Sequence, residues 1–126
     1  MKLILAALLL TAQTAQAPTL SYDGKRFRTQ FEAGAVHACV AYRSHTQTIQ
    51  EGDKMVPYTF RRCFGLPSTL TSFYTDWGGV SCTITDVAKG QMDCPAADTW
   101  DIYSEVQYDT GNSIETRQSN TITEKH

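Results

Sequence analysis

Apolar and polar residues alternate strictly between Trp100 and Tyr108, and this is the clearest pattern in the chain. One face of the alternation is larger and mostly apolar, and consists of Trp100, Ile102, Ser104, Val106 and Tyr108. A period of two is typical of a β-strand with one buried face. Residues 109–113 then supply turn-forming side chains, and Ile114–Thr123 continues without Pro or Gly. The pattern predicts that the chain ends in a β-hairpin.

The pairing of the two strands follows from the face that must be buried. Burial favours a register in which Tyr108 lies opposite Ile114 and Trp100 lies opposite Ile122. A shift by one residue would place Tyr108 opposite Glu115 and would turn Ile114 and Ile122 outward. We therefore expect the first of these two registers.

Shorter alternating stretches precede this hairpin and are separated by turn-forming residues. They are residues 36–43, 58–64, 70–75, 80–85 and 91–94. Thr46–Pro57 is polar and predicts a loop or a hairpin connection, and Phe27 and Phe31 have the spacing of a helix turn. No stretch of ten or more residues has a helical stripe. About seven short strands without βαβ units predict an all-β fold, an antiparallel sandwich or barrel.

The first 17 residues have the pattern of a signal peptide. Lys2 precedes the apolar run Leu3–Leu10, and Ala15 and Ala17 are the small residues that a signal peptidase requires. The apolar run is shorter than the roughly 20 residues that span a bilayer. An N-terminal core helix is the alternative, but it would normally carry polar residues at helical spacing. We expect cleavage near Pro18 and a single secreted domain formed by residues 18–126.

The cysteines agree with export. All four lie within residues 18–126, at positions 39, 63, 82 and 94, and an even number in a small secreted domain predicts two disulfides. Three connectivities are possible. A hairpin over residues 80–94 would place Cys82 opposite Cys94, which favours the pairs Cys82–Cys94 and Cys39–Cys63. A zinc site is the alternative, but no C-x₂-C pair is present, so we expect neither a metal nor a cofactor.

The charge of the chain argues against nucleic acid as a partner. The formal net charge is −2, with seven Lys and Arg against four Asp and Glu in residues 18–63 and three against nine in residues 64–126. A nucleic-acid binder is normally basic with a clustered patch. No second apolar run is long enough to cross a membrane once residues 1–17 are removed. The acids at positions 86, 93, 98 and 101 lack the order of an EF-hand and predict a solvated acidic surface.

The C-terminal hairpin resembles a known type of module. Trp100–Thr123 combines an alternating strand with a central Tyr, a Gly/Asn turn and a Ser/Thr-rich last strand. It is similar to the closing hairpin of immunoglobulin-like and fibronectin type III domains, over about a quarter of residues 18–126. The resemblance implies an antiparallel β-sandwich. No cysteine lies in residues 100–123, so the immunoglobulin Cys–Trp–Cys spacing is absent and no binding residue is inferred from the resemblance.

Catalytic signals are weak. A hydrolase or ribonuclease requires a histidine beside a carboxylate, and His37 with Glu32 or Glu51, near Arg61 or Arg62, is one such combination. No spacing supports that pair, and no G-x-S-x-G, H-E-x-x-H or paired-cysteine redox motif is present. The absence of a catalytic pair favours binding over catalysis.

The strongest candidate for a binding surface is Phe73–Gly79. Phe73, Tyr74 and Trp77 precede a Gly-Gly turn, and exposed aromatic side chains beside such a turn can stack on a sugar or a protein side chain. The alternative is that Phe73 and Trp77 belong to the core. The sequence thus favours a secreted, disulfide-bonded module that binds a protein or a carbohydrate. A small secreted hydrolase or nuclease, and a periplasmic structural or immunity-type protein, are the alternatives.

Overall fold

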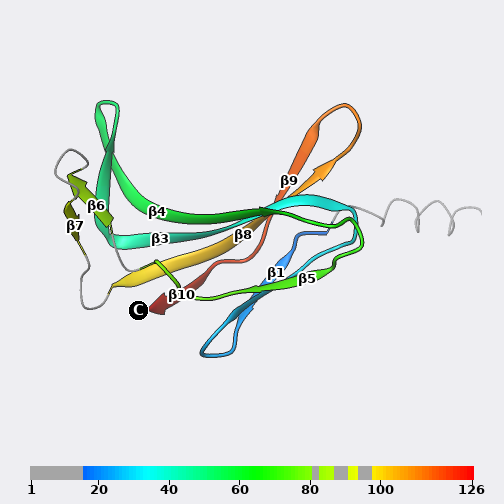
Figure 1. Cartoon of the computed structure of the whole chain (residues 1–126), viewed down its shortest axis with the longest axis horizontal. Helices are drawn as coiled ribbons and strands as arrows, with labels where there is room; N and C mark the ends of the chain where they lie inside the picture. Colours follow the sequence, from blue (N-terminus) through cyan, green and yellow to red (C-terminus); the bar gives the residue numbers. More distant parts are fainter. Residues whose placement is uncertain (1–15, 81–82, 87–90, 94–97) are drawn as a thin grey trace, which may run out of the picture.

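The computed structural model describes residues 16–80, 83–86, 91–93 and 98–126 (Figure 1). The regular elements in these ranges are all β-strands, and every pair of strands is antiparallel. The strands are β1 (Thr19–Tyr22), β2 (Phe27–Gln30), β3 (Ala35–Glu51), β4 (Lys54–Gly65), β5 (Ser72–Thr75), β6 (Thr83–Asp86), β7 (Gln91–Asp93), β8 (Thr99–Asp109), β9 (Ile114–Gln118) and β10 (Ile122–Lys125). The all-β prediction is therefore confirmed. Two strands, β1 and β2, were not expected from the sequence, and β3 and β4 are much longer than expected.

The strands form two principal sheets and one small hairpin. A three-stranded sheet has the order β1-β2-β5, and a five-stranded sheet has the order β10-β8-β3-β4, with β9 also paired to β8. In Figure 1 β1 and β5 lie along one face of the sheet that contains β3 and β8. Strands β6 and β7 form a separate two-stranded sheet. The face of the five-stranded sheet that points away from the three-stranded sheet is called the outer face below.

The core lies between the two principal sheets. Its largest fully buried side chains are Trp100 on β8, Tyr42 on β3 and Phe27 on β2, and they belong to one cluster with Leu20 and Val80. The alternation of β8 is confirmed, because every second residue from Trp100 onward is buried. Full burial of each of these apolar side chains stabilises the fold by about 1.5–3 kcal/mol.

A polar residue interrupts the buried face of β8 and is satisfied within the core. Ser104 is completely buried, and its hydroxyl shares a hydrogen bond of 2.7 Å with the hydroxyl of Thr29 on β2. Its backbone N–H donates to the hydroxyl of Ser119 at 2.8 Å. Burying a hydroxyl is tolerated when it has such partners, and here the bond joins the two sheets.

The predicted register of the C-terminal hairpin is wrong by one residue. Tyr108 pairs with Glu115, and Ile114 pairs with Asp109 and is 54% exposed. The turn determines this result: the carboxylate of Asp109 accepts the N–H of Gly111, which has a φ of +92°. Because β9 extends beyond the core, burial of apolar side chains does not determine its register.

The last strand is also displaced from its predicted register. Trp100 pairs with Glu124 and Ile102 pairs with Ile122, so β10 is a separate strand and not a continuation of β9. Asn120 interrupts the chain between them, because its side-chain amide binds the backbone N–H and C=O of Leu20 at 2.8 and 3.0 Å. Asn120 thereby pairs with the edge of β1 as a strand residue would.

The disulfide framework is described in part. Cys39 on β3 and Cys63 on β4 lie directly opposite each other and form a disulfide, with their Cα atoms 4.1 Å apart. Ile84 on β6 pairs with Met92 on β7, which is the pairing predicted for this hairpin. The predicted partners Cys82 and Cys94 lie outside the described residues.

Candidate functional site

A bulge in β3 gives the outer face its shape. Arg43 pairs with Thr59 and Thr48 pairs with Pro57, so four residues of β3, 44–47, face a single residue of β4. Bulges bend the strand that carries them and increase its twist. The end of the β3–β4 hairpin, residues 48–57, therefore rises from the sheet as an arm (Figure 1). This segment, predicted as a loop or a hairpin connection, is mostly strand.

The bulge is held by a buried carboxylate. Asp98 is 5% exposed and accepts hydrogen bonds from the hydroxyl of Ser44 and, at 3.1 Å, from the side-chain amide of Gln47. The Ser44 oxygen in turn accepts the backbone N–H groups of Thr46 and Gln47. Burial raises the pKa of Asp98, but the hydrogen bonds from Ser44, Thr46, Gln47 and Thr99 outweigh burial and hold that pKa below its usual value. Asp98 therefore stays ionised at neutral pH.

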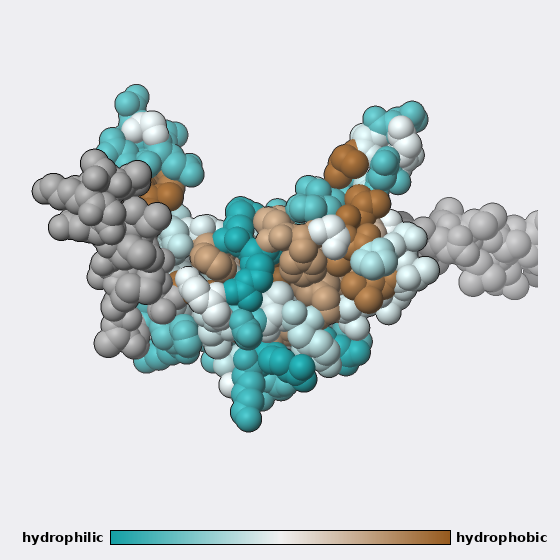
Figure 2. All heavy atoms as spheres, viewed as in Figure 1, coloured by the Kyte–Doolittle hydropathy of each residue, from teal (hydrophilic) through white to brown (hydrophobic). Residues whose placement is uncertain are grey.

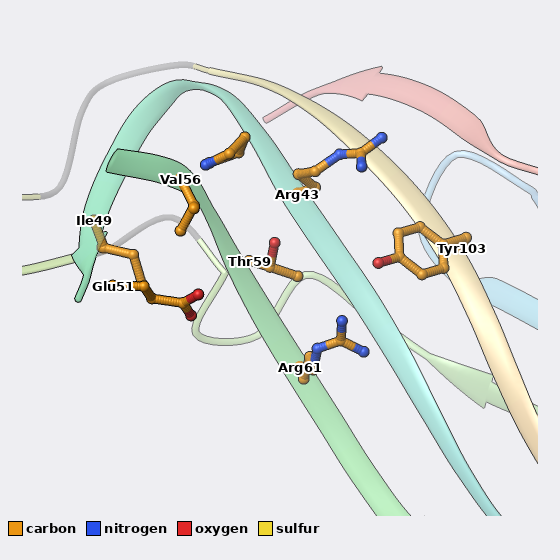
Figure 3. Close-up of a pocket in the computed structure, with 8 residues that line it drawn as sticks. Arg43, Ile49, Glu51, Val56, Thr59, Arg61 and Tyr103 are labelled. Carbon is orange, nitrogen blue, oxygen red and sulfur yellow. The ribbon is translucent and has the colours of Figure 1, made fainter. Parts of the chain in front are cut away.

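This arm, residues 48–57, is called the first arm. Because it rises from the sheet, an open hollow of about 370 Å³ forms on the outer face (Figure 3). Its floor is the phenol of Tyr103 on β8, which lies between the guanidinium groups of Arg43 on β3 and Arg61 on β4. Its wall is the aliphatic surface of Ile49 and Val56 on the arm. Glu51 and Thr59 also line it, so the hollow combines an aromatic ring and charged groups of both signs with an apolar side.

Neighbouring carboxylates fix the two arginines. Arg61 forms a hydrogen-bonded ion pair with Glu105, and this bond raises the pKa of Arg61. Arg43 lies 3.6 Å from the carboxylate of Asp101, and its guanidinium carbon lies 6.0 Å from the centroid of the Tyr103 ring. Side chains that are held before a ligand arrives lose less entropy when it binds.

Beside the hollow lies a histidine–carboxylate pair that sequence analysis missed. Nε2 of His45 is 2.9 Å from the carboxylate of Asp101, which also accepts a hydrogen bond of 2.6 Å from the hydroxyl of Thr123. The hydrogen bond from Thr123, followed by that from His45, lowers the pKa of Asp101. Of the two carboxylates considered for His37, Glu32 instead binds Arg117 at 3.0 Å, and Glu51 lines the hollow. His45 could have been found only from the pairing of β3 with β8, which the bulge obscures.

The three aromatic residues predicted to bind a partner do not form one surface. Phe73 is half-buried and packs edge-to-face on Phe64 at 4.7 Å, whereas the next residue of β5, Tyr74, points outward and is 48% exposed. Trp77 packs against the core, and its indole N–H donates to the hydroxyl of Tyr22 at 3.0 Å. Alternation along β5 separates Phe73 from Tyr74 onto opposite faces.

Two further rings contact Trp77. The ring of the C-terminal His126 stacks on the indole at 4.3 Å with an interplanar angle of 8°. Phe27 meets the indole edge-to-face at 5.1 Å. Trp77 is half-buried, so it contributes to packing while part of the indole remains exposed.

Within the described ranges, no group of three or more His, Cys, Asp or Glu side chains is arranged to hold a metal ion. The same part of the chain contains no helix that is both long enough and apolar enough to cross a membrane. No protein-family model, curated protein or solved structure matches the sequence or the fold. A functional assignment therefore rests on the geometry of this chain alone.

Proposed function

We propose that the chain is a secreted β-sandwich, immunoglobulin-like in its general form, that binds a protein partner on its outer face. The observation that carries this proposal is the hollow, whose floor presents Tyr103 between Arg43 and Arg61. Tyrosine and arginine are enriched among the residues that dominate binding energy at protein interfaces. Both arginines are ion-paired with carboxylates of β8 before binding, and this restrains their side chains.

Two arms flank the outer face and extend the candidate interface. The first is residues 48–57, and the second is the β8–β9 turn region, residues 109–118; both project from the body of the molecule (Figure 2). Each carries a large apolar side chain in contact with water: Met55 is 62% exposed and Ile114 is 54% exposed. A partner that sits between the arms would bury both side chains, and burial of apolar area favours association. Met and aromatic residues are typical of the centre of such interfaces.

Secretion is supported by two features of the chain. Residues 1–17 have the pattern of a signal peptide, and Cys39 and Cys63 form a disulfide. Disulfides persist in oxidising compartments such as the extracellular space and the bacterial periplasm. A periplasmic immunity-type protein would use the same face against an enzyme.

A photo-crosslinking experiment tests the protein-partner proposal. A photoreactive phenylalanine analogue is introduced in turn at Met55, at Ile114 and, as a control, at the exposed Thr69 in the turn between β4 and β5, and each protein is irradiated in the secreted fraction of its source organism. We expect one protein adduct of the same identity from Met55 and Ile114, lost when Tyr103→Ser is added, and absent from Thr69. Adducts that differ between the two arms, or that survive Tyr103→Ser, would contradict the proposal.

The same variants distinguish an inhibitor or immunity-type protein from a carbohydrate-binding protein. If the captured protein is an enzyme whose activity falls on binding, the chain is an inhibitor or immunity-type protein. If no protein is captured but a glycan array is bound and Tyr103→Ser abolishes that binding, the partner on this face is a carbohydrate. The planar guanidinium groups of Arg43 and Arg61 beside Tyr103 can contact either a protein or a carbohydrate.

The His45–Asp101 pair favours a hydrolase or nuclease as a second candidate. Asp101 can orient the imidazole and stabilise its protonated form, which is how a carboxylate assists a general base. Arg43 lies against the same carboxylate and could bind an oxyanion. Hydrolysis of RNA, ester or peptide substrates that is lost in His45→Ala and retained in His37→Ala would support this function. Equal activity in both variants would exclude His45 as the base.

A further inference from the structure

Among the described residues, strands β1, β2 and β5 place no carboxylate on the side of their sheet that points away from the core. Two rows of side chains cross β1, β2 and β5 there, because residues paired across neighbouring strands share a face. The rows are Thr19, Gln30 and Ser72, and Ser21, Arg28 and Tyr74. The alternate residues Leu20, Phe27 and Thr29 are buried in the core. This side of the molecule therefore presents hydroxyl and amide groups, one exposed aromatic ring and positive charge.

The positive charge gathers around Tyr74. The guanidinium carbon of Arg26 lies 4.1 Å from the centroid of the Tyr74 ring, and that of Arg28 lies 5.8 Å from it. Lys25 is the adjacent exposed residue. The nearest acid in the turn, Asp23, accepts the backbone N–H groups of Lys25 and Arg26 at 2.8 and 2.7 Å. These hydrogen bonds, that of Arg26 first, and the nearby charge of Arg26 lower the pKa of Asp23, so Asp23 is an ionised neighbour of the cluster whose carboxylate is used in the turn.

The arginines of this cluster differ from the others in the chain. The other four are each within 4.0 Å of a carboxylate: Arg43, Arg61, Arg62 and Arg117. Among the described residues, neither Arg26 nor Arg28 has such a partner, and Nε of Arg28 is buried without a hydrogen-bond acceptor. Among the described residues, Arg26 and Arg28 are thus the arginines without a carboxylate within 4.0 Å, and both lie against Tyr74.

We propose that this basic face, formed by Lys25, Arg26, Arg28 and Tyr74, is a second binding site whose ligand is a sulfated glycan. Guanidinium groups bind sulfate oxygens through paired, charge-assisted hydrogen bonds. The neighbouring hydroxyl and amide side chains can form hydrogen bonds with the hydroxyl groups of a sugar chain. The site is distinct from the hollow, which lies on the outer face of the other sheet.

Binding at this site would differ from a general attraction of the whole protein to polyanions. The formal net charge of the chain is −2 at pH 7, so overall charge opposes the binding of a polyanion. Hydrophilic residues gather at the lower tip of the molecule in Figure 2, where Figure 1 places the turn between β1 and β2. Retention on a sulfated matrix would therefore have to come from a local cluster of charge.

Heparin binding measured at physiological ionic strength tests the proposal on the full domain. The test variant is Arg26→Gln/Arg28→Gln, and the matched control is Arg43→Gln/Arg61→Gln, which removes the same charge from the hollow. We expect the wild type to bind, the test variant to bind about tenfold or more weakly, and the control to remain within about twofold of the wild type. Arg26 is exposed, so Arg26→Gln alone provides a folded variant if the double substitution does not fold. Absence of binding by the wild type, or equal losses in both double variants, would overturn the proposal.

Competition identifies the chemical class of the ligand. Soluble heparin is expected to displace the protein at much lower concentration than desulfated heparin, inorganic sulfate or inorganic phosphate. Single-stranded DNA of matched charge is expected to compete poorly, because the basic face offers one tyrosine and not a series of stacking platforms. If DNA competes as well as heparin per unit of charge, the site binds polyanions without selecting a glycan and the assignment is wrong. The crosslinking experiment on the two arms does not depend on this result.

Discussion

Asp98 is expected to control both the stability of the domain and the shape of its hollow. Its carboxylate accepts hydrogen bonds from Ser44, Gln47 and the backbone N–H of Thr99, and Asp98 itself is 5% exposed. Asp98→Ala leaves these three donors without an acceptor. A buried polar group that loses its partner costs about 1–3 kcal/mol. Because Thr99 is only half-buried and can recruit water, we expect a total loss of about 3–5 kcal/mol.

Asp98→Asn removes the charge of this residue but keeps its size and shape, so it isolates the contribution of the charge to the free energy of unfolding. The amide keeps one acceptor oxygen in place, so the expected loss is smaller, about 1–2 kcal/mol. The folded pKa of Asp98 lies below its usual value of 3.8. A carboxylate with a lowered pKa stabilises the fold fully above the unfolded pKa, and that stabilisation is lost as the pH falls through the folded pKa. The difference in free energy of unfolding between wild type and Asp98→Asn should therefore be constant near neutral pH and shrink below about pH 4.

Urea unfolding from pH 3 to pH 8 measures these differences in the free energy of unfolding. Backbone hydrogen exchange in residues 48–57 reports whether the first arm keeps its conformation. Asp53→Asn, in the exposed turn of the same arm, is the matched control because it makes the same chemical change. We expect faster exchange at residues 48–51 in Asp98→Ala and no change in the control. If Asp98→Ala loses less than about 1 kcal/mol, or if the difference from Asp98→Asn does not depend on pH, Asp98 does not hold the bulge.

Four further outcomes follow from the core and from the disulfides. Trp100→Ala should cost about 3–5 kcal/mol in denaturant unfolding, and Tyr103→Ala, on the outer face, much less. Trp77→Ala should cost about 2–4 kcal/mol, since the indole packs between aromatic rings; an unchanged stability would mean that Trp77 is free to bind. Replacing both members of the Cys39–Cys63 disulfide by Ala should cost about 3 kcal/mol. Intact-mass measurement with and without reduction should count two disulfides, and a free thiol would contradict the expected framework.

The sequence predicted the strand that organises the core. Trp100, Ile102 and Val106 are completely buried because β8 is central in its sheet, with β3 on one side and β9 and β10 on the other. For a central strand, burial dictates which face each residue takes, so the period of two is reliable. Strands β1 and β2 lacked this signal, because each has only four residues.

The register of β9 could not be predicted from the same principle. The expected register assumed that Ile114 must be buried, but β9 extends past the core and Ile114 is half exposed. There the local chemistry of the turn decides: Asp109 binds the N–H of Gly111, and Thr110 binds the backbone oxygen of Ser113. Hydrophobic patterning specifies register only for strands that have a core to face.

The candidate site was hidden for a different reason. The hollow exists because residues 44–47 of β3 form a bulge, and the bulge depends on Asp98, which is 51 residues away from Gln47 in sequence. Neither the polar composition of Thr46–Pro57 nor the alternation of β8 predicts the contact between Asp98 and Gln47. Arg43, Arg61 and Tyr103 are each ordinary outward-facing strand residues, and only the pairing β4-β3-β8 brings them together.

The two proposed binding faces should respond differently to salt, because their charges are organised differently. On the outer face Arg43 and Arg61 are already paired with Asp101 and Glu105, so a ligand there meets a fixed, nearly neutral surface. On the basic face Arg26 and Arg28 have no carboxylate within reach among the described residues, and a polyanion must supply it. Screening weakens interactions between exposed charges as ionic strength rises, whereas apolar burial is little affected or strengthened. Glycan binding should therefore fall steeply with added salt while binding between the two arms persists, and this contrast assigns an unknown ligand to one face before any variant is made.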